Sequence, residues 1–291
     1  MRSEYTNMKP ILKWVGGKTQ ILDVLDESIP DEMENYYEPF LGGGSVLLMV
    51  LDKKKVRGKV HASDVNKHLI DMYIQIQQDP TGLLKELRTI TDEFESLIGT
   101  DVNRSPKTFA EAITSKESYY YWVRSSFNAD PTPAKLIFLN KTCFRGVYRE
   151  GPNGFNVPYG HYKNPQVYDW KHIQEVSELI QGVEFRCESF DKALARVQTP
   201  RDFVYLDPPY APEKQNSFVG YTSDGFDKHE VLFTLCKKLP CQFVMSNSKV
   251  SLVTNAFDGG QYNIQVVSCK RSINSKHPES RTDEVIISKK E

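Results

Sequence analysis

The stretch from Asn35 to Asp64, NYYEPFLGGGSVLLMVLDKKKVRGKVHASD, sets the architecture of the chain. It opens with a short apolar run at 35–40, which is interrupted by the glycines at 42–44. A second apolar run at 45–51 predicts a helix, for which Ser45 is a suitable N-cap. Residues 58–64 predict another strand, which ends in Asp64. This order of strand, helix and strand predicts a βαβ unit.

Length and composition indicate a folded protein with a substantial core. The chain has 291 residues, of which 39% are hydrophobic and 26% charged. This length suits one large domain or a domain with an insertion, and the composition argues against general disorder. The formal net charge is −1. The overall charge therefore does not indicate binding to nucleic acid. Any evidence for such binding has to come from the local distribution of charge.

Several classes of protein are disfavoured. The longest apolar run, near residues 46–51, is too short to span a bilayer, and the first ten residues carry no apolar signal segment. Five cysteines without a C-x-x-C pair indicate reduced thiols and a cytoplasmic protein. The six histidines show no ligand spacing, so we expect no metal site.

The rest of the chain contains a helical and loop-rich region, followed by a region in which strands predominate. Helices are expected at 66–78, 81–98 and 116–129, where the YYYW run at 119–122 serves packing, and a hairpin or irregular loop is expected at 141–164. Further strands are expected at 183–190, 203–207, 241–248, 262–269 and 283–289, with a helix at 227–239. This pattern predicts an α/β catalytic domain at 1–66 and 166–291. Residues 67–165 are its insertion, a helical bundle followed by a hairpin at 141–165.

The glycine turn and Asp64 predict a ligand site. Ligands of parallel α/β sheets bind at the carboxyl ends of strands, where an acid after the second strand accepts hydrogen bonds from ribose hydroxyls. The three consecutive glycines do not match the dinucleotide pattern G-x-G-x-x-G. A nucleoside ligand without phosphates, such as S-adenosylmethionine, therefore fits better. The alternative is a tight turn followed by a helix that Asp64 caps.

A second glycine pair lies in LKWVGGKTQIL, residues 12–22. The spacing of a phosphate-binding P-loop is absent. Trp14 could instead pack on a nucleoside, and Lys18 could pair with a carboxylate such as that of the methionine part of S-adenosylmethionine. The alternative is an ordinary loop with a core tryptophan.

The third motif is RDFVYLDPPYAPEK, residues 201–214. An exocyclic amine on a base is a poor nucleophile because its lone pair is delocalised into the ring. Asp207 and the Pro208 carbonyl, on a backbone that proline stiffens, could each accept one N–H and localise that pair. Tyr210 could stack on a base that has left the duplex. The alternative is a strand end followed by a polyproline-like turn.

Together these motifs resemble the Dam-type DNA adenine-N6 methyltransferases of the α group. The resemblance rests on LKWVGGK (12–18), EPFLGGGS (38–45), SDVN (63–66), GFNVPYGHYKNP (154–165), CESF (187–190) and DPPYAP (207–212). It implies a Rossmann-like S-adenosylmethionine-dependent fold with a helical and hairpin DNA-recognition insertion. The implied donor-binding residues are Trp14, Lys18, Phe40, Gly42, Gly43, Asp64, Phe190 and Asp207, and the implied catalytic residues are Asp207, Pro208, Pro209 and Tyr210. Ser189 stands where many relatives have an acid.

The resemblance also implies contacts with double-stranded DNA. Arg149 and Lys13 match base-reading positions, Phe144 matches an aromatic wedge and Pro158 could touch a thymine methyl group. Backbone contacts are implied for Arg124, Asn156, His161, Tyr162 and Lys163. Arg145 replaces the asparagine that is usual in GATC-specific members, so the target is GATC or a CATG-like palindrome. Residues 141–163 and 270–281 each carry a net charge of +3, as DNA-binding loops do. The alternative for each segment is a solvated loop with surplus positive charge.

Four activities are compatible with these sequence features. The first is methylation of a flipped adenine at N6 in a short palindromic duplex site, in a bacterium or by a virus inside its host. The enzyme would be a monomer or weak dimer with no membrane partner, and a cognate restriction endonuclease could accompany it. The second is an N4-cytosine or RNA N6-adenine methyltransferase, against which Asp207 argues. The others are a nicotinamide-dependent oxidoreductase and a non-catalytic DNA-binding protein.

Overall fold

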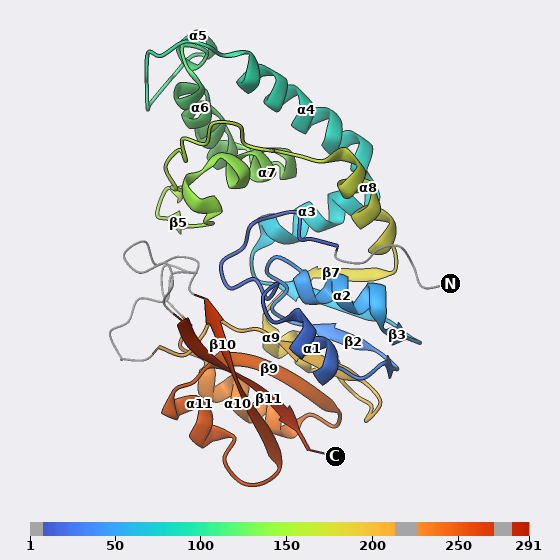
Figure 1. Ribbon diagram of the computed structural model, residues 1–291. Helices are drawn as coiled ribbons and strands as arrows, with labels where there is room; N and C mark the ends of the chain where they lie inside the picture. Colours follow the sequence, from blue (N-terminus) through green and yellow to red (C-terminus); the bar gives the residue numbers. More distant parts are fainter. Residues whose placement is uncertain (1–7, 213–225, 271–280, 291) are drawn as a thin grey trace. The chain divides into compact units, whose positions relative to one another are not determined.

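The computed structural model describes residues 8–212, 226–270 and 281–290 (Figure 1). The chain divides into two compact units. Unit 1 comprises residues 1–7, 18–65 and 182–291, and unit 2 comprises residues 8–17 and 66–181. Unit 2 is thus larger than the expected insertion at 67–165, because α8 (Trp170–Leu179) packs on α3 (Lys67–Gln78) and α4 (Pro80–Ser96). That unit 2 recognises the target remains a prediction.

A seven-stranded sheet organises unit 1. Its strands, in spatial order, are β10 (Tyr262–Lys270), β11 (Arg281–Lys289), β9 (Gln242–Ser248), β8 (Phe203–Leu206), β2 (Tyr36–Glu38), β4 (Val60–Asp64) and β7 (Val183–Cys187). The five strands from β9 to β7 are parallel, whereas β11 runs antiparallel to both of its neighbours. The predicted α/β class with a mostly parallel sheet is therefore confirmed.

The glycine turn joins β2 to α2 (Ser45–Lys53) as predicted, but Ser45 does not cap the helix. Gly44 occupies the cap position with a left-handed φ of 71°, and Gly42 also has a positive φ of 48°. Glycine adopts these conformations without a Cβ penalty. Ser45 is the first helical residue, and its hydroxyl accepts a hydrogen bond from the Lys18 backbone N–H at 3.3 Å. The prediction of Ser45 as N-cap was wrong because the turn places it one residue inside the helix.

Helices cover the sheet of unit 1 and complete its core. They are α1 (Leu22–Ser28), α2, α9 (Phe190–Leu194), α10 (His229–Lys238) and α11 (Ser251–Ala256). Two further short strands, β1 (Glu32–Met33) and β3 (Lys55–Val56), form a separate parallel pair. Every residue of β8 is buried, as expected for a central strand with both faces covered. The predicted strand at 183–190 ends at Cys187, and Phe190 begins α9 instead.

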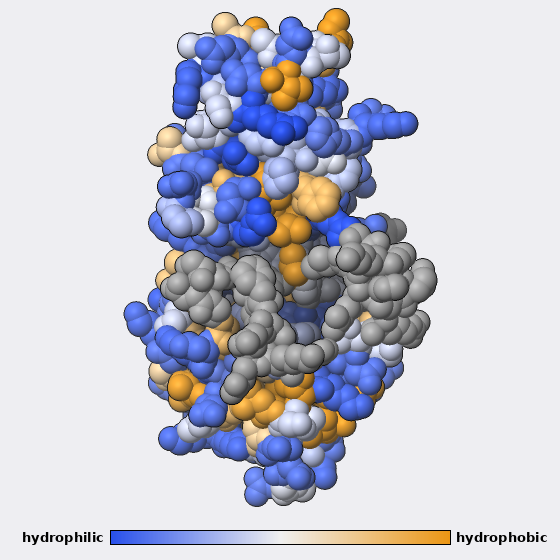
Figure 2. All heavy atoms as spheres, turned by 90° about the vertical axis from the view of Figure 1, so that its left-hand side faces the viewer, coloured by the Kyte–Doolittle hydropathy of each residue, from blue (hydrophilic) through white to orange (hydrophobic). Residues whose placement is uncertain are grey.

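The strand β10 forms one edge of this sheet. Figure 2 shows apolar side chains gathered over the C-terminal part of unit 1, with polar side chains around them. Val266 on β10 and Leu252 on α11 are exposed apolar residues of unit 1. Exposed apolar side chains of this kind are common on folded proteins and indicate no function by themselves. No helix in the described ranges is long and apolar enough to cross a membrane.

Unit 2 is helical. Besides α3, α4 and α8 it contains α5 (Phe109–Ala112), α6 (Lys116–Ala129) and α7 (Pro133–Thr142). Side chains that accept from backbone N–H groups cap several of these helices, at Asn66, Asp79, Ser115 and Thr132. The Tyr119–Tyr121 run is buried in α6, as predicted for a packing segment. The α7 helix is almost entirely buried and was not predicted separately, because an apolar run without periodicity does not distinguish helix from strand.

The expected hairpin at 141–164 is present as a small element. A 3-10 turn at Phe144–Gly146 precedes β5 (Glu150–Gly151) and β6 (Gly154–Phe155), which pair antiparallel. The carboxamide of Asn128 on α6 accepts from the Phe155 N–H at 2.8 Å and donates to the Phe155 carbonyl at 3.0 Å. The hairpin is therefore anchored to α6, while most of its chain is irregular.

Candidate active site

Three strand ends bring acidic residues to one edge of the unit 1 sheet. Glu38 ends β2, Asp64 ends β4, and Asp207 follows β8. Both β4 and β8 pair parallel with β2. Because carboxyl ends of parallel strands meet at the same edge, this edge is where such a sheet binds ligands.

Asp207 lies beside a buried lysine. Lys18 Nζ is 2.7 Å from Asp207 Oδ2, and the exposed fractions of the two side chains are 3% and 20%. Burial raises the pKa of Asp207 to about 6, although Lys18 opposes the rise, and the charge of Glu284 adds to it. The second carboxylate oxygen, Oδ1, is buried and has no hydrogen-bond partner among the described residues. A buried acceptor without a donor is uncommon and marks a place where a ligand can donate.

The turn after Asp207 is held from several directions. The Tyr210 ring lies 4.9 Å from Lys18 Nζ, and its hydroxyl donates to Glu284 Oε2 at 2.7 Å. Two polar residues at the end of β9 hold Ala211, because its N–H donates to Asn247 Oδ1 at 3.0 Å and its carbonyl accepts from Ser248 Oγ at 2.5 Å.

The two proline carbonyls of the turn differ. His229 Nε2 lies 3.0 Å from the Pro209 carbonyl oxygen, whereas no described residue bonds to the Pro208 carbonyl oxygen. No described part of the chain therefore occupies the Pro208 carbonyl oxygen, and a ligand can donate to it. The predicted acceptor pair requires this.

The expected donor-binding residues of unit 1 come together around the glycine turn. The Gly42 N–H donates to Asp64 Oδ2 at 3.0 Å, and the rings of Phe40 and Phe190 stack at 5.4 Å. Asp64 thus closes the turn, and Asn66 caps the next helix in its place. Trp14 instead belongs to unit 2 and stacks on Tyr148 at 5.3 Å, so its donor contact stays a prediction.

Glu38 was not predicted as part of this site. Its side chain is 2% exposed, and Glu38 Oε2 accepts from the Tyr36 hydroxyl at 2.7 Å. Burial raises the pKa of Glu38 to about 8, with a further rise from the charge of Asp207. Burial therefore favours the protonated form of Glu38 at neutral pH. The sequence feature that could have pointed to Glu38 is an acidic residue at the carboxyl end of an apolar strand.

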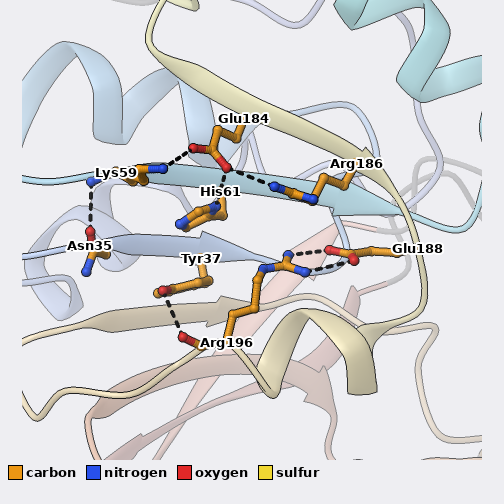
Figure 3. A network of polar contacts seen from close by, with 8 residues as sticks. All are labelled: Asn35, Tyr37, Lys59, His61, Glu184, Arg186, Glu188 and Arg196. Atoms are coloured by element: carbon orange, nitrogen blue, oxygen red, sulfur yellow. Dashed lines mark hydrogen bonds and ion pairs between the residues drawn. The ribbon is translucent and has the colours of Figure 1, made fainter.

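A separate polar network lies on β2, β4 and β7 (Figure 3). His61 stacks on Tyr37 at 4.6 Å, and its Nδ1 is 3.4 Å from Glu184 Oε2, a contact without hydrogen-bond geometry. A hydrogen bond from Lys59 is the main cause that lowers the pKa of Glu184 to about 2. Arg196 Nη1 donates to Glu188 Oε2 at 2.8 Å. The first contacts join the neighbouring strands β2, β4 and β7, whereas Glu188 and Arg196 lie just after β7 and α9. None of these contacts includes a predicted site residue.

Unit 2 brings several of the predicted DNA-binding residues together. Lys13 Nζ lies 5.1 Å from the Tyr162 ring, and the Lys13 side chain approaches Gly146 so closely that a Cβ there would meet it at 2.6 Å. Phe144 is 50% exposed, and the Arg145 guanidinium lies 5.3 Å from its ring. Arg145 has a left-handed φ of 60°, which is strained for a residue with a side chain.

The other predicted DNA-binding residues have partners inside unit 2. Arg149 Nε donates to Asn156 Oδ1 at 2.7 Å, and Arg124 Nη1 donates to the Val157 carbonyl at 3.2 Å. The Pro158 carbonyl accepts from the Phe144 N–H, and His161 Nε2 lies 3.7 Å from Glu117 Oε2. Lys163 is exposed. The structure thus places Asn156 against Arg149, and its contact with the DNA backbone stays a prediction.

Comparison with known proteins identifies the family. The family model described as D12 class N6 adenine-specific DNA methyltransferase matches residues 14–273. This chain belongs to that family. The chain is 37% identical to "Type II methyltransferase M.MjaIII" of Methanocaldococcus jannaschii, over 92% of this chain and 94% of the relative. It is 31% identical to "Retron Ec67 DNA adenine methylase" of Escherichia coli, over 96% and 90%.

Membership settles the reaction. This methyltransferase uses S-adenosylmethionine and methylates adenine at N6 in DNA. The residues at the sheet edge are compatible with a bound ligand that carries N–H groups, because Asp207 Oδ1 is buried without a hydrogen-bond donor among the described residues. Within the described residues, no group of three or more histidine, cysteine, aspartate or glutamate side chains could hold a metal ion.

Sequence reasoning missed the residues that hold the catalytic turn. Asn247, Ser248, His229 and Glu284 all contact residues 209–211. The only signal was the polar triplet that ends the apolar strand β9. The predicted basic segment 270–281 lies almost entirely outside the described residues.

Proposed function

We propose that Asp207 and the Pro208 carbonyl activate the amino group of an adenine that has been flipped out of duplex DNA. Bound S-adenosylmethionine supplies the electrophilic methyl group on its sulfonium. The observation that carries the proposal is the buried, unpartnered Asp207 Oδ1 next to a proline carbonyl that no described residue uses.

Each acceptor takes one N–H of the adenine amine. Two acceptors favour a pyramidal nitrogen whose lone pair is no longer delocalised into the ring, which makes it a better nucleophile. Lys18 keeps Asp207 ionised against the cost of burial, since the two groups are 2.7 Å apart. Tyr210 provides a rigid aromatic face for the base.

Donor binding is assigned to the glycine turn and its neighbours. Gly42 and Gly43 allow close approach to the backbone, and Asp64 accepts from the ribose hydroxyls. The stacked rings of Phe40 and Phe190 provide the apolar wall beside the adenine moiety of the donor. Trp14 completes this set by resemblance alone.

DNA recognition is assigned to unit 2. Arg149 reads guanine, Lys13 reads another base and Phe144 wedges into the base stack, while Arg145 lies beside the Phe144 ring. Arg124, Asn156, His161, Tyr162 and Lys163 are assigned to the backbone and Pro158 to a thymine methyl group. The target is GATC or a CATG-like palindrome, and mapping N6-methyladenine on host DNA by single-molecule sequencing will distinguish the two.

The name of one relative supports a proposal for the biological setting. The name "Type II methyltransferase" of the Methanocaldococcus jannaschii relative supports the inference that a cognate restriction endonuclease accompanies this enzyme. We infer a monomer or weak dimer that acts in the cytoplasm of a bacterium or of a virus-infected cell. Survival of a host that expresses the endonuclease only when this chain is present would support the pairing.

Substitution of Asp207 tests the mechanism. Asp207→Ala removes one acceptor and should lower methyl transfer to duplex DNA by at least a hundredfold, about 3 kcal/mol of barrier. Transfer is measured with a labelled donor, and the DNA is digested to nucleosides to identify N6-methyladenine. Asp258→Asn, an exposed acid of the same unit, is the control. Full turnover by a folded Asp207→Ala variant would remove the proposed mechanism.

A further inference from the structure

The hydroxyl of Tyr210 is bound by a residue that lies 74 positions further along the chain. Tyr210 Oη donates to Glu284 Oε2 at 2.7 Å, a charge-assisted hydrogen bond. Glu284 belongs to β11, the strand that runs antiparallel to β9. Because β11 is reversed, its first residues lie beside the carboxyl end of β9, and Glu284 therefore reaches the catalytic edge of the sheet.

The same strand pair holds the residue after Tyr210. Glu284 is directly paired in register with Ser248, and Val285 is paired with Asn247. Ser248 and Asn247 bind the carbonyl and the N–H of Ala211, while Glu284 binds the side chain of Tyr210. Two consecutive residues of the catalytic turn are thus fixed by one rung of the β9–β11 ladder and its neighbour.

We propose that Glu284 is a positioning residue that fixes the plane of the Tyr210 ring for stacking on the target adenine. The inference rests on the proposed role of Tyr210. A phenol ring held only by the contact with Lys18 at 4.9 Å could still tilt. A second point of attachment at the hydroxyl removes that freedom, and preorganised contacts of this kind lower the entropic cost of reaching the transition state.

The charge of Glu284 also acts on Asp207. Two charged groups near Asp207 change its pKa: Lys18 lowers it and Glu284 raises it. The other titratable groups that interact with Asp207 are Glu38, Tyr205 and Tyr210. A neutral residue at position 284 removes one of the charges that raise the pKa of Asp207. The acid limb of the activity profile should therefore move to lower pH when Glu284 loses its charge.

Three variants test the proposal. Glu284→Ala removes the acceptor and should lower kcat on duplex DNA by about tenfold to a hundredfold, with donor affinity unchanged. Glu284→Gln keeps an oxygen acceptor without the charge, so it should retain most of kcat and shift the acid limb to lower pH. Asp283→Asn, which removes the same charge from the neighbouring residue that pairs with Lys249 at 3.4 Å, should change neither.

A cycle with Tyr210→Phe separates positioning from general loss of structure. If Glu284 acts through the hydroxyl, the double variant Glu284→Ala/Tyr210→Phe should lose no more kcat than Tyr210→Phe alone. Additive losses, or a Glu284→Ala enzyme with wild-type kcat, would overturn the proposal. If the wild type makes N6-methyladenine and the variants give one of these results, only the role of Glu284 is refuted. If the wild type makes no N6-methyladenine, the proposed function itself is refuted.

Discussion

At the scale of the residue, Asp207 carries a negative charge where burial opposes it. The nearby Lys18 ammonium stabilises the carboxylate, yet the pKa of Asp207 remains raised to about 6. The balance leaves the group ionised at neutral pH but sensitive to mild acid. Perturbed carboxyls of this kind are frequent at catalytic sites, because the chemistry needs a desolvated but charged acceptor.

This balance predicts the pH dependence of catalysis. Protonation of Asp207 removes an acceptor for the adenine amine, so activity should decline as pH falls through about 6. The measurement is kcat/KM between pH 5 and pH 8, since this ratio reports groups of the free enzyme. An acid limb near the ordinary pKa of an aspartate, about 4, would contradict the raised value.

At the scale of the element, the end of β2 places Glu38 inside the core. Glu38 is 2% exposed and hydrogen bonded to Tyr36 of the same strand. Its pKa, raised to about 8, means that the folded state keeps this proton while the unfolded chain releases it near the ordinary value of 4.5. Between these values the folded state binds more protons than the unfolded state.

The sign of the linkage follows. The free energy of unfolding should fall with rising pH between about 4.5 and 8 on account of Glu38, by up to about 1.4 kcal/mol per pH unit. Glu38→Gln cannot ionise, and its amide oxygen can still accept from Tyr36. The variant should therefore become more stable relative to wild type as pH rises, and urea unfolding at pH 5, 7 and 9 measures this.

The matched control is Glu27→Gln, an exposed position on α1. Its stability relative to wild type should be the same at the three pH values. A constant difference for Glu38→Gln as well would show that Glu38 is ionised in the folded state, contrary to the expectation from burial.

At the scale of the whole molecule, the net charge gives no indication that the protein acts on DNA. The net charge is −1, but the segment 141–163 of unit 2 is locally positive. Phosphate contacts release counterions, so affinity for DNA depends on the local cations and not on the sum over the chain.

Salt dependence measures those contacts. Lys163→Gln should weaken binding to all duplex sequences alike and reduce the slope of log Kd against log salt concentration by about 1. Lys238→Gln, an exposed lysine on α10 of unit 1, should leave the slope unchanged. An equal change in both variants would remove the assignment of Lys163 to the DNA backbone.

The sequence by itself determined the elements and the residues at their ends. Asp64 and Asp207 were expected at strand ends because apolar runs, glycines and prolines report local conformation, and the parallel order of a βαβ unit places such ends at one edge. The motif order also predicted the family, which the comparison confirmed.

Only the tertiary structure decided which distant groups meet. Tyr210 and Glu284 lie 74 positions apart, and Lys18 and Asp207 lie much further apart still. Their contacts depend on the pairing of β11 with β9 and on the packing of the chain around Ser45, and no local periodicity encodes either. The same holds for Glu38 and Trp14: their residue types could be read from the chain, but burial, pKa and stacking partners arise only when strands and helices pack.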